Sequence, residues 1–156
     1  HAIVPFYGQG MNASFEDVVE FDKVLDKNLE SWEATFNAYE KTRKKDTDAI
    51  ADLAIDNFHE MKDHVAKTIF QEKRKLEMAL EKEFPNDYSS KYSLVTFNED
   101  LGYNEAMLRG RAQDKAILNM LSDGTLKDDD DLKSILDKVK RETEANIKDD
   151  RIAVLI

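Results

Sequence analysis

The chain has 156 residues, which is enough for one domain with an apolar core. Its 33 acidic and 23 basic residues give a formal net charge of −10, which repels a phosphate backbone, so we expect no nucleic-acid partner. The lack of cysteine excludes disulfides, zinc–thiolate sites and thiol catalysis, and no apolar run reaches the roughly 18 residues of a membrane-spanning helix, so we expect a soluble, cytoplasmic protein.

Helical spacing of apolar residues dominates between the only two prolines, Pro5 and Pro85. This pattern predicts a mainly α fold. The first helix is expected to follow Asn12. Its apolar positions are Phe15, Val18, Val19, Phe21 and Leu25.

A second helix is predicted over residues 31–44, and Asp46 or Thr47 is expected to cap a third. Either side chain can accept hydrogen bonds from the free amides of a helix start. The third helix is predicted to continue to Phe84, where the proline that follows stops it. Because this run is long for one globular helix, we expect a kink or break within residues 64–69.

The second half of the chain predicts one extended segment and two further helices. Residues 91–98 are rich in β-branched and aromatic side chains, which favour a short strand. A fourth helix is expected over residues 103–121, ending at Gly124. The acidic run KDDDDLK opens a fifth, and the last residues, IAVLI, are expected to pair as a strand or to lie under a helix. The apolar stripe of the fifth helix, interpreted as core, is Leu132, Ile135, Leu136 and Val139.

A glycine turn precedes the first helix. Glycine allows backbone angles and close approaches that a Cβ would block, so Gly8-Gln9-Gly10 can lie flat against a ligand. The first amides of the helix behind it have no intrahelical acceptor, and the positive end of the helix dipole stabilises negative charge there. The alternative is a plain tight turn into a helix, which a bare Gly-x-Gly favours on its own.

The segment VPFYGQGMN followed by FED resembles the C-terminal FAD motif of flavin-dependent aromatic hydroxylases. In that family the motif wraps the isoalloxazine ring. The resemblance implies that the backbone at Met11 and Asn12 faces the pyrimidine edge of the flavin, and that the helix start stabilises the charge of the reduced ring. The implied cofactor-binding residues are Pro5, Gly8, Gln9, Gly10, Met11 and Asn12.

Asn57 falls in the apolar stripe of the third predicted helix, and Glu60 and Met61 follow it at i+3 and i+4, on the same helix face. A buried amide must find hydrogen-bond partners or costs about 1–3 kcal/mol. A substrate could supply these partners. The alternative is a core asparagine that bonds to neighbouring backbone.

Four separated segments narrow the resemblance to the kynurenine 3-monooxygenases: PFYGQGMNASFED, DNFHEM, KYSLVTF and YNEAMLRG occur in that family's order and approximate spacing, within residues 1–124. By this resemblance, Asn57 and Tyr92 help to hold the amino-acid end of the substrate. The implied substrate-binding residues are Phe6, Tyr7, Asn57, Glu60, Met61 and Tyr92.

The resemblance implies a helical C-terminal segment of an FAD-dependent aromatic hydroxylase, in which NADPH reduces FAD and L-kynurenine is hydroxylated to 3-hydroxykynurenine. We expect a flavin-contacting turn and helix in residues 1–28, a pocket region in 29–124, and a terminal helix and tail in 125–156. The Gly-x-Gly-x-x-Gly turn of the N-terminal dinucleotide-binding part is not in these residues, so the chain alone is expected to be inactive. The alternative is a non-enzymatic helical interaction module.

No side chain is expected to act as a catalytic nucleophile or strong base, because the flavin supplies the oxygen chemistry. Two metal motifs are also rejected. His59 and His64 are five residues apart, whereas a zinc-binding helix needs its histidines at i and i+4. The acidic residues 123–131 lack the ligand spacing and the glycine of a calcium loop, so we interpret them as a helix cap.

Overall fold

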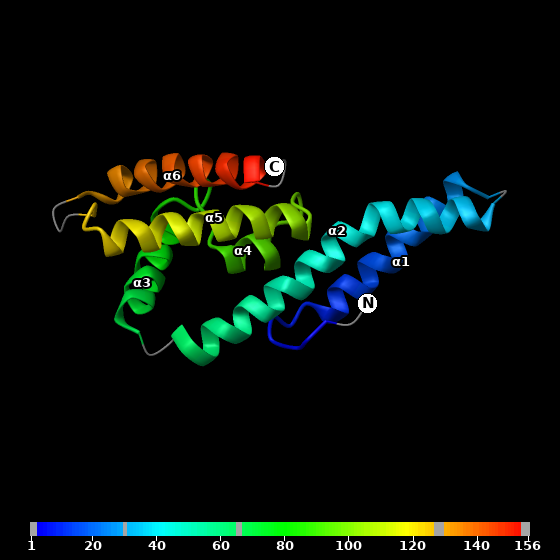
Figure 1. The fold of residues 1–156 in the computed structure, drawn as a ribbon, viewed down its shortest axis with the longest axis horizontal. Coiled ribbons are helices and arrows are strands. Elements are labelled where there is room, and N and C mark those ends of the chain that lie inside the picture. The colour runs from blue at the N-terminus through cyan, green and yellow to red at the C-terminus, as the bar shows by residue number, and fades with distance from the viewer. Residues whose placement is uncertain (1–2, 30, 65–66, 127–129, 154–156) are drawn as a thin grey trace. The chain divides into compact units, whose positions relative to one another are not determined.

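The computed structural model describes residues 3–29, 31–64, 67–126 and 130–153, with the side chains of residues 63–64 and 150–153 also left aside. In this part of the chain every regular element is a helix (Figure 1). They are α1 (Gly10–Lys27), α2 (Trp32–His59), the π-helical η1 (Glu60–His64), α3 (Thr68–Glu83), α4 (Lys91–Thr96), α5 (Tyr103–Ser122) and α6 (Leu132–Ala153). The mainly α prediction is therefore confirmed.

The helices form two compact units. One comprises His1–Glu60 with Gly102–Asn104, and the other comprises Met61–Leu101 with Glu105–Ile156. Among the described residues, no helix combines the length and the apolar character that crossing a membrane requires.

In the first unit, α1 and α2 pack side by side as a helical hairpin (Figure 1). The helix α1 begins at Gly10, three residues before the predicted start after Asn12. At the hairpin turn, the Ser31 hydroxyl accepts a hydrogen bond from the Ala34 amide and caps α2. Small and branched apolar side chains of both helices are buried. They are Ala13, Val24, Ala49, Ile50, Leu53 and Ala54.

The predicted helix boundary near residue 46 is wrong, because α2 runs unbroken from Trp32 to His59. Both expected caps make other bonds. The Asp46 carboxylate accepts a hydrogen bond from the backbone amide of Asn104 at 2.8 Å. The Thr47 hydroxyl donates back to the carbonyl of Arg43, four residues earlier, which is the usual bond of a threonine inside a helix.

The long helical run breaks where the sequence predicted. The π-helical turn η1 closes α2, and α3 begins at Thr68, which lies within the expected interval. The end of α3 at Glu83, just before Pro85, is also as predicted.

The predicted strand at residues 91–98 is wrong, because most of it forms the short helix α4. Ser90 caps this helix, since its hydroxyl accepts a hydrogen bond from the Ser93 amide. The Ser90 amide in turn donates to the Glu81 carboxylate of α3 at 2.7 Å. A cap and a tertiary bond thus outweigh the β-propensity of the segment.

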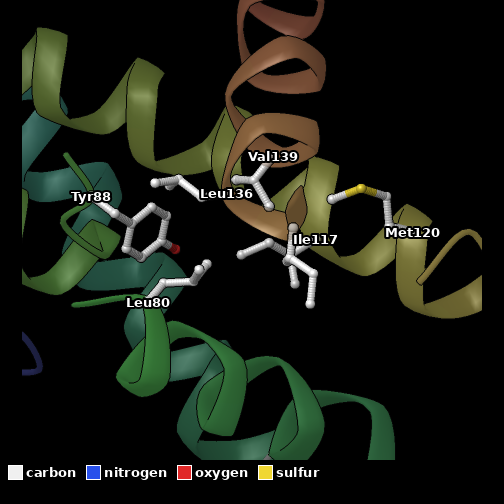
Figure 2. Close-up of a cluster of buried hydrophobic side chains, with 7 residues drawn as sticks. Leu80, Tyr88, Ile117, Met120, Leu136 and Val139 are labelled. Carbon is white, nitrogen blue, oxygen red and sulfur yellow. The ribbon is translucent and has the colours of Figure 1, made fainter. Parts of the chain in front are cut away.

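The second unit has an apolar core, formed by side chains of α3, α5 and α6 together with Tyr88 (Figure 2). Leu80, Ile117 and Leu136 are fully buried, and each such side chain contributes roughly 1.5–3 kcal/mol on burial. The stripe predicted on the fifth helix is confirmed as core: Ile135, Leu136 and Val139 are buried and Leu132 is partly buried against them.

Both ends of the loop between α5 and α6 follow the prediction. Gly124, just after α5, has a φ of 72°, a conformation that favours glycine. Asp131 caps α6 by accepting a hydrogen bond from the Ser134 amide at 2.9 Å. A strand or a position under a helix was expected for residues 152–156; the first two of them end α6, and residues 154–156 lie outside the described part.

Candidate functional site

The glycine turn leads directly into α1. Gly8 has a φ of 75°, so the turn requires glycine there. Gly10 has no such requirement, and no described atom lies within 4 Å of the position that a Cβ on Gly10 would occupy. The space in front of Gly10 is therefore open to a ligand.

The start of α1 has no side-chain cap within the described part of the chain. Gln9 is the N-cap residue, but its side-chain oxygen accepts a hydrogen bond from the Asn12 amide group at 2.7 Å. The first hydrogen bond of the helix runs from the Ala13 amide to the Gln9 carbonyl. The backbone amides of Gly10, Met11 and Asn12 come before it, so they have no acceptor within the helix. This uncapped positive end suits a negatively charged or electron-rich group.

A second set of contacts fastens the turn to α2. The half-buried Asn57 donates its side-chain amide to the Phe6 carbonyl at 2.5 Å. The rings of Phe6 and Phe58 pack with their centroids 4.8 Å apart, and Tyr7 is buried. Asn57 thus has a backbone partner of the kind that the alternative interpretation expected, and its contact with substrate stays a prediction.

The face predicted for Asn57, Glu60 and Met61 from α-helical spacing spans the junction between α2 and the π-helical turn η1. Asn57 lies in the last turn of α2, whereas Glu60 and Met61 open the π-helical turn η1. A π-helix takes more residues per turn than an α-helix, but Glu60 keeps α-helical backbone angles and its amide bonds to the Asp56 carbonyl, so the shared face stays a prediction. Glu60 is half-buried and Met61 is exposed.

Tyr92, the other predicted substrate contact, belongs to the second unit and lies on α4. Its ring is about half exposed and packs edge-on against Phe97 at a centroid distance of 6.0 Å. The neighbouring Lys91 fixes α4 to α5, because its ammonium lies 2.7 Å from an Asp114 carboxylate oxygen. A Cβ on Gly110 of α5 would lie only 2.5 Å from Lys91 Cγ, so this mid-helix glycine allows the close approach of α4.

Sequence reasoning missed the group that holds α1, which is the buried guanidinium of Arg43 in α2. Arg43 lies 2.9 Å from an Asp17 carboxylate oxygen and 3.3 Å from a Glu16 oxygen, and it donates to the Ala13 carbonyl. The FED segment therefore binds an arginine within the chain. The only signal in the sequence is the single arginine of the basic run KTRKK, residues 41–45.

The charges around Arg43 reinforce one another. Burial lowers the pKa of its guanidinium, but the hydrogen bond to Asp17 and the negative charges of Asp17 and Glu16 outweigh this and raise it. The Tyr103 hydroxyl donates to the other Glu16 oxygen at 2.8 Å. Burial and this bond raise the pKa of Tyr103, so the phenol stays protonated.

One face of α1 is apolar and exposed. Ala13 and Val24 are buried in the unit, whereas Met11, Phe15, Val18 and Val19 are between 52% and 70% exposed. These four residues follow helical spacing, so they form one stripe that begins at the uncapped helix start. Such a contiguous apolar stripe is typical of a surface that another part of a protein covers.

No protein-family model matches the chain. Among curated proteins, it resembles the kynurenine 3-monooxygenase of Dictyostelium discoideum, with 43% identity over 136 residues, covering 80% of this chain and 29% of that protein. The kynurenine 3-monooxygenase of Myxococcus xanthus is 40% identical over 141 residues, or 90% of this chain and 30% of that protein. That of Sus scrofa is 40% identical over 117 residues, or 75% of this chain and 25% of that protein. The chain thus spans less than a third of the length of these relatives.

Proposed function

Because the chain belongs to the kynurenine 3-monooxygenase family, we propose that it forms the C-terminal part of a monooxygenase that uses FAD and NADPH to hydroxylate L-kynurenine to 3-hydroxykynurenine. The observation that carries this proposal is the uncapped start of α1 behind the turn Gly8-Gln9-Gly10, in a segment about 40% identical to these enzymes. The isolated 156 residues are proposed to be inactive, since the Gly-x-Gly-x-x-Gly turn of a dinucleotide-binding strand is not among them.

The flavin fits the groups that the chain presents. When bound, FAD supplies the redox and oxygen chemistry, and the protein supplies binding, orientation and electrostatics. The amides of Met11 and Asn12 would hold the electron-rich edge of the ring, and Pro5 and Gln9 would shape the backbone before them. The missing Cβ of Gly10 leaves room for a close approach.

The substrate wall is proposed to include Phe6, Tyr7, Asn57, Glu60, Met61 and Tyr92. Asn57 would position the turn and the substrate together, because its side chain already donates to the Phe6 carbonyl. Its amide oxygen is the group with which it would meet an ammonium of kynurenine.

The exposed stripe of α1 supports a larger assembly. Four apolar side chains that start at the flavin-binding turn are proposed to pack against the dinucleotide-binding part. The same stripe also favours the second candidate, a non-enzymatic helical module that binds a protein partner. The two functions differ in flavin binding.

A chimera tests the proposal. Residues 1–124 replace the matching segment of a kynurenine 3-monooxygenase relative, and the product is assayed for flavin absorbance and for NADPH oxidation stimulated by kynurenine. We expect a yellow protein with both properties. A chimera that folds but stays colourless, next to a yellow parent enzyme, would overturn the proposal in favour of the module.

Gly10→Ala tests whether the flavin lies against Gly10. In the isolated chain this substitution is expected to leave the melting temperature unchanged or slightly raised, because the added Cβ meets open space and alanine favours a helix. In the chimera it should lower the FAD content. The matched control is Gly8→Ala, which strains the turn and should destabilise both proteins. Equal FAD content in the Gly10→Ala chimera and the parent chimera would refute the flavin position.

Asn57→Ala and Tyr92→Phe test the substrate wall in the same chimera. Each is expected to raise the KM for kynurenine about tenfold or more, a change of roughly 1.4 kcal/mol, with a much smaller effect on stability. Unchanged KM together with a large fall in melting temperature would assign both residues a structural role. The cytoplasmic location expected from the sequence stays a prediction.

A further inference from the structure

The second unit contains a cavity of about 480 Å³ that includes no residue of the proposed flavin or substrate site. Its walls come from α5, α6, α4 and the segments on either side of α4, with Leu94 and Val139 as apolar lining. The volume lies within the range of roughly 300–1,000 Å³ that is usual for small-molecule sites.

Three residues on the walls each have a buried polar atom without a hydrogen-bond partner among the described residues, and one of these atoms is the hydroxyl of Tyr88. The other two are the side-chain oxygen of Gln113 and the hydroxyl of Thr143, whose residues are 8% and 4% exposed. The other end of the Gln113 amide donates to the Ser89 carbonyl. Buried polar atoms are nearly always satisfied, so the Gln113 oxygen is available to accept a hydrogen bond from a molecule in the cavity.

Charged groups of both signs line the same cavity. Arg109 lies one turn before Gln113 on α5, and Glu144 faces it from α6 at 4.0 Å, the long end of an ion pair. Lys140 is paired closely with Asp87 at 2.6 Å. The Arg109 guanidinium is thus the less tightly paired of the two cations, and it has N–H donors that a ligand can use. The formal charges of the two ion pairs sum to zero.

We propose that this cavity binds a small zwitterion of the α-amino-acid type, with its carboxylate on Arg109 and its ammonium on the Gln113 oxygen beside Glu144. Thr143 can accept from the ammonium or donate to the carboxylate, and an aliphatic side chain lies against Leu94 and Val139. A ligand with a single charge would leave one of these walls unpaired. The inference concerns residues outside the monooxygenase site, so it stands or falls independently of the proposed function.

The test is an NMR titration of the full 156-residue chain with L-leucine, followed through backbone amides and the side-chain amide of Gln113. We expect saturable shifts confined to the cavity walls, with a dissociation constant of about 1 mM or tighter. L-leucinamide lacks the carboxylate and 4-methylpentanoate lacks the ammonium, and each should bind at least tenfold more weakly. No saturable shift, or equal binding of the three compounds, would mean that only water fills the cavity and would overturn the proposal.

Variants assign the contacts. Arg109→Gln is expected to weaken L-leucine binding tenfold or more, whereas the matched control Arg141→Gln, on the exposed face of α6, should leave it unchanged. Gln113→Met removes the oxygen acceptor at similar volume, and Thr143→Val is a second probe if that variant fails to fold. Full binding by a folded Arg109→Gln variant would refute the arrangement.

Discussion

Asp114 neutralises two buried lysines, so Asp114→Asn is expected to destabilise the second unit strongly. Its carboxylate oxygens lie 2.7 Å from the Lys73 ammonium and 2.7 Å from the Lys91 ammonium, and both lysine side chains are 9% exposed. Glu77 supplies the second negative charge, 3.2 Å from Lys73, and burial raises the pKa of its carboxyl. The asparagine would leave two buried ammonium groups with one nearby carboxylate.

Removing one partner of a buried pair costs about 3–5 kcal/mol, a large part of a domain's usual 5–15 kcal/mol. At about 2–4 °C per kcal/mol, the melting temperature should fall by roughly 10 °C. The assay is urea and thermal unfolding followed by circular dichroism at pH 7.

The matched control is Asp137→Asn, which breaks an exposed i, i+4 pair with Lys133. It should change the free energy of unfolding by less than about 0.5 kcal/mol. Adding Lys91→Met to Asp114→Asn removes the uncompensated ammonium, so the double variant should be more stable than Asp114→Asn alone. An Asp114→Asn variant as stable as the Asp137→Asn control would refute the reasoning.

Three further predictions concern the same unit. Gly110→Ala should lower stability by about 1–3 kcal/mol in urea unfolding, despite alanine's better helix propensity, because the new Cβ meets Lys91; a gain would contradict the close approach. Burial opposes ionisation of Glu81, but hydrogen bonds from Ser93 and Ser90 outweigh burial and lower the pKa of the Glu81 carboxyl. The ionised carboxylate therefore stabilises the fold at pH values above its unfolded-state pKa of about 4.3. This stabilisation is lost as the pH falls through the lower pKa of the folded state. The urea midpoint of Glu81→Gln should therefore lie below that of the parent at pH 7 and approach it in acid, and a pH-independent gap would exclude this linkage. Thr143→Val should raise stability by about 1 kcal/mol in urea, since it removes a buried hydroxyl without a described partner; a loss would show that the hydroxyl is bonded.

The parts of the fold that local chemistry determines were predictable. Proline 85 ends a helix because it lacks an amide hydrogen and blocks the preceding turn, and Asp131 caps α6 with a side chain next to the helix start. The helix boundary predicted near residue 46 was wrong for a different reason. Asp46 fits the capping pattern, but its partner is an amide 58 residues away, which no local pattern reveals.

The short helix α4 failed for a similar reason. Its valine, tyrosine and phenylalanine favour a strand, and only Ser90 signalled a helix start. Its contacts with Glu81, Asp114 and Gly110 come from other helices. Each of these residues was visible in the sequence, but their convergence depends on the tertiary structure.

In the candidate flavin site, too, local features were predictable and tertiary contacts were not. The motif located the glycine turn, and the open space at Gly10 is the kind of feature that a short Gly-x-Gly cannot by itself distinguish from a plain turn. The Arg43 cluster was not predicted, because its residues belong to two helices and look like ordinary surface charge in the sequence. The amphipathic pattern of α1 correctly marked apolar residues, but it could not say that half of them face away from the unit.

Side-chain contacts hold the backbone of the glycine turn, while the space at Gly10 is open. Asn57 donates to the Phe6 carbonyl, and Arg43 donates to the Ala13 carbonyl while it binds Asp17. These contacts fix the backbone on either side of Gln9 without any group from a flavin. A preorganised site avoids the entropy cost of ordering on binding. If the proposed function holds, the turn therefore contributes to FAD affinity without a large ordering cost. Breaking the support with Asn57→Ala should then weaken flavin binding by loosening the turn, even though Asn57 would not touch the ring.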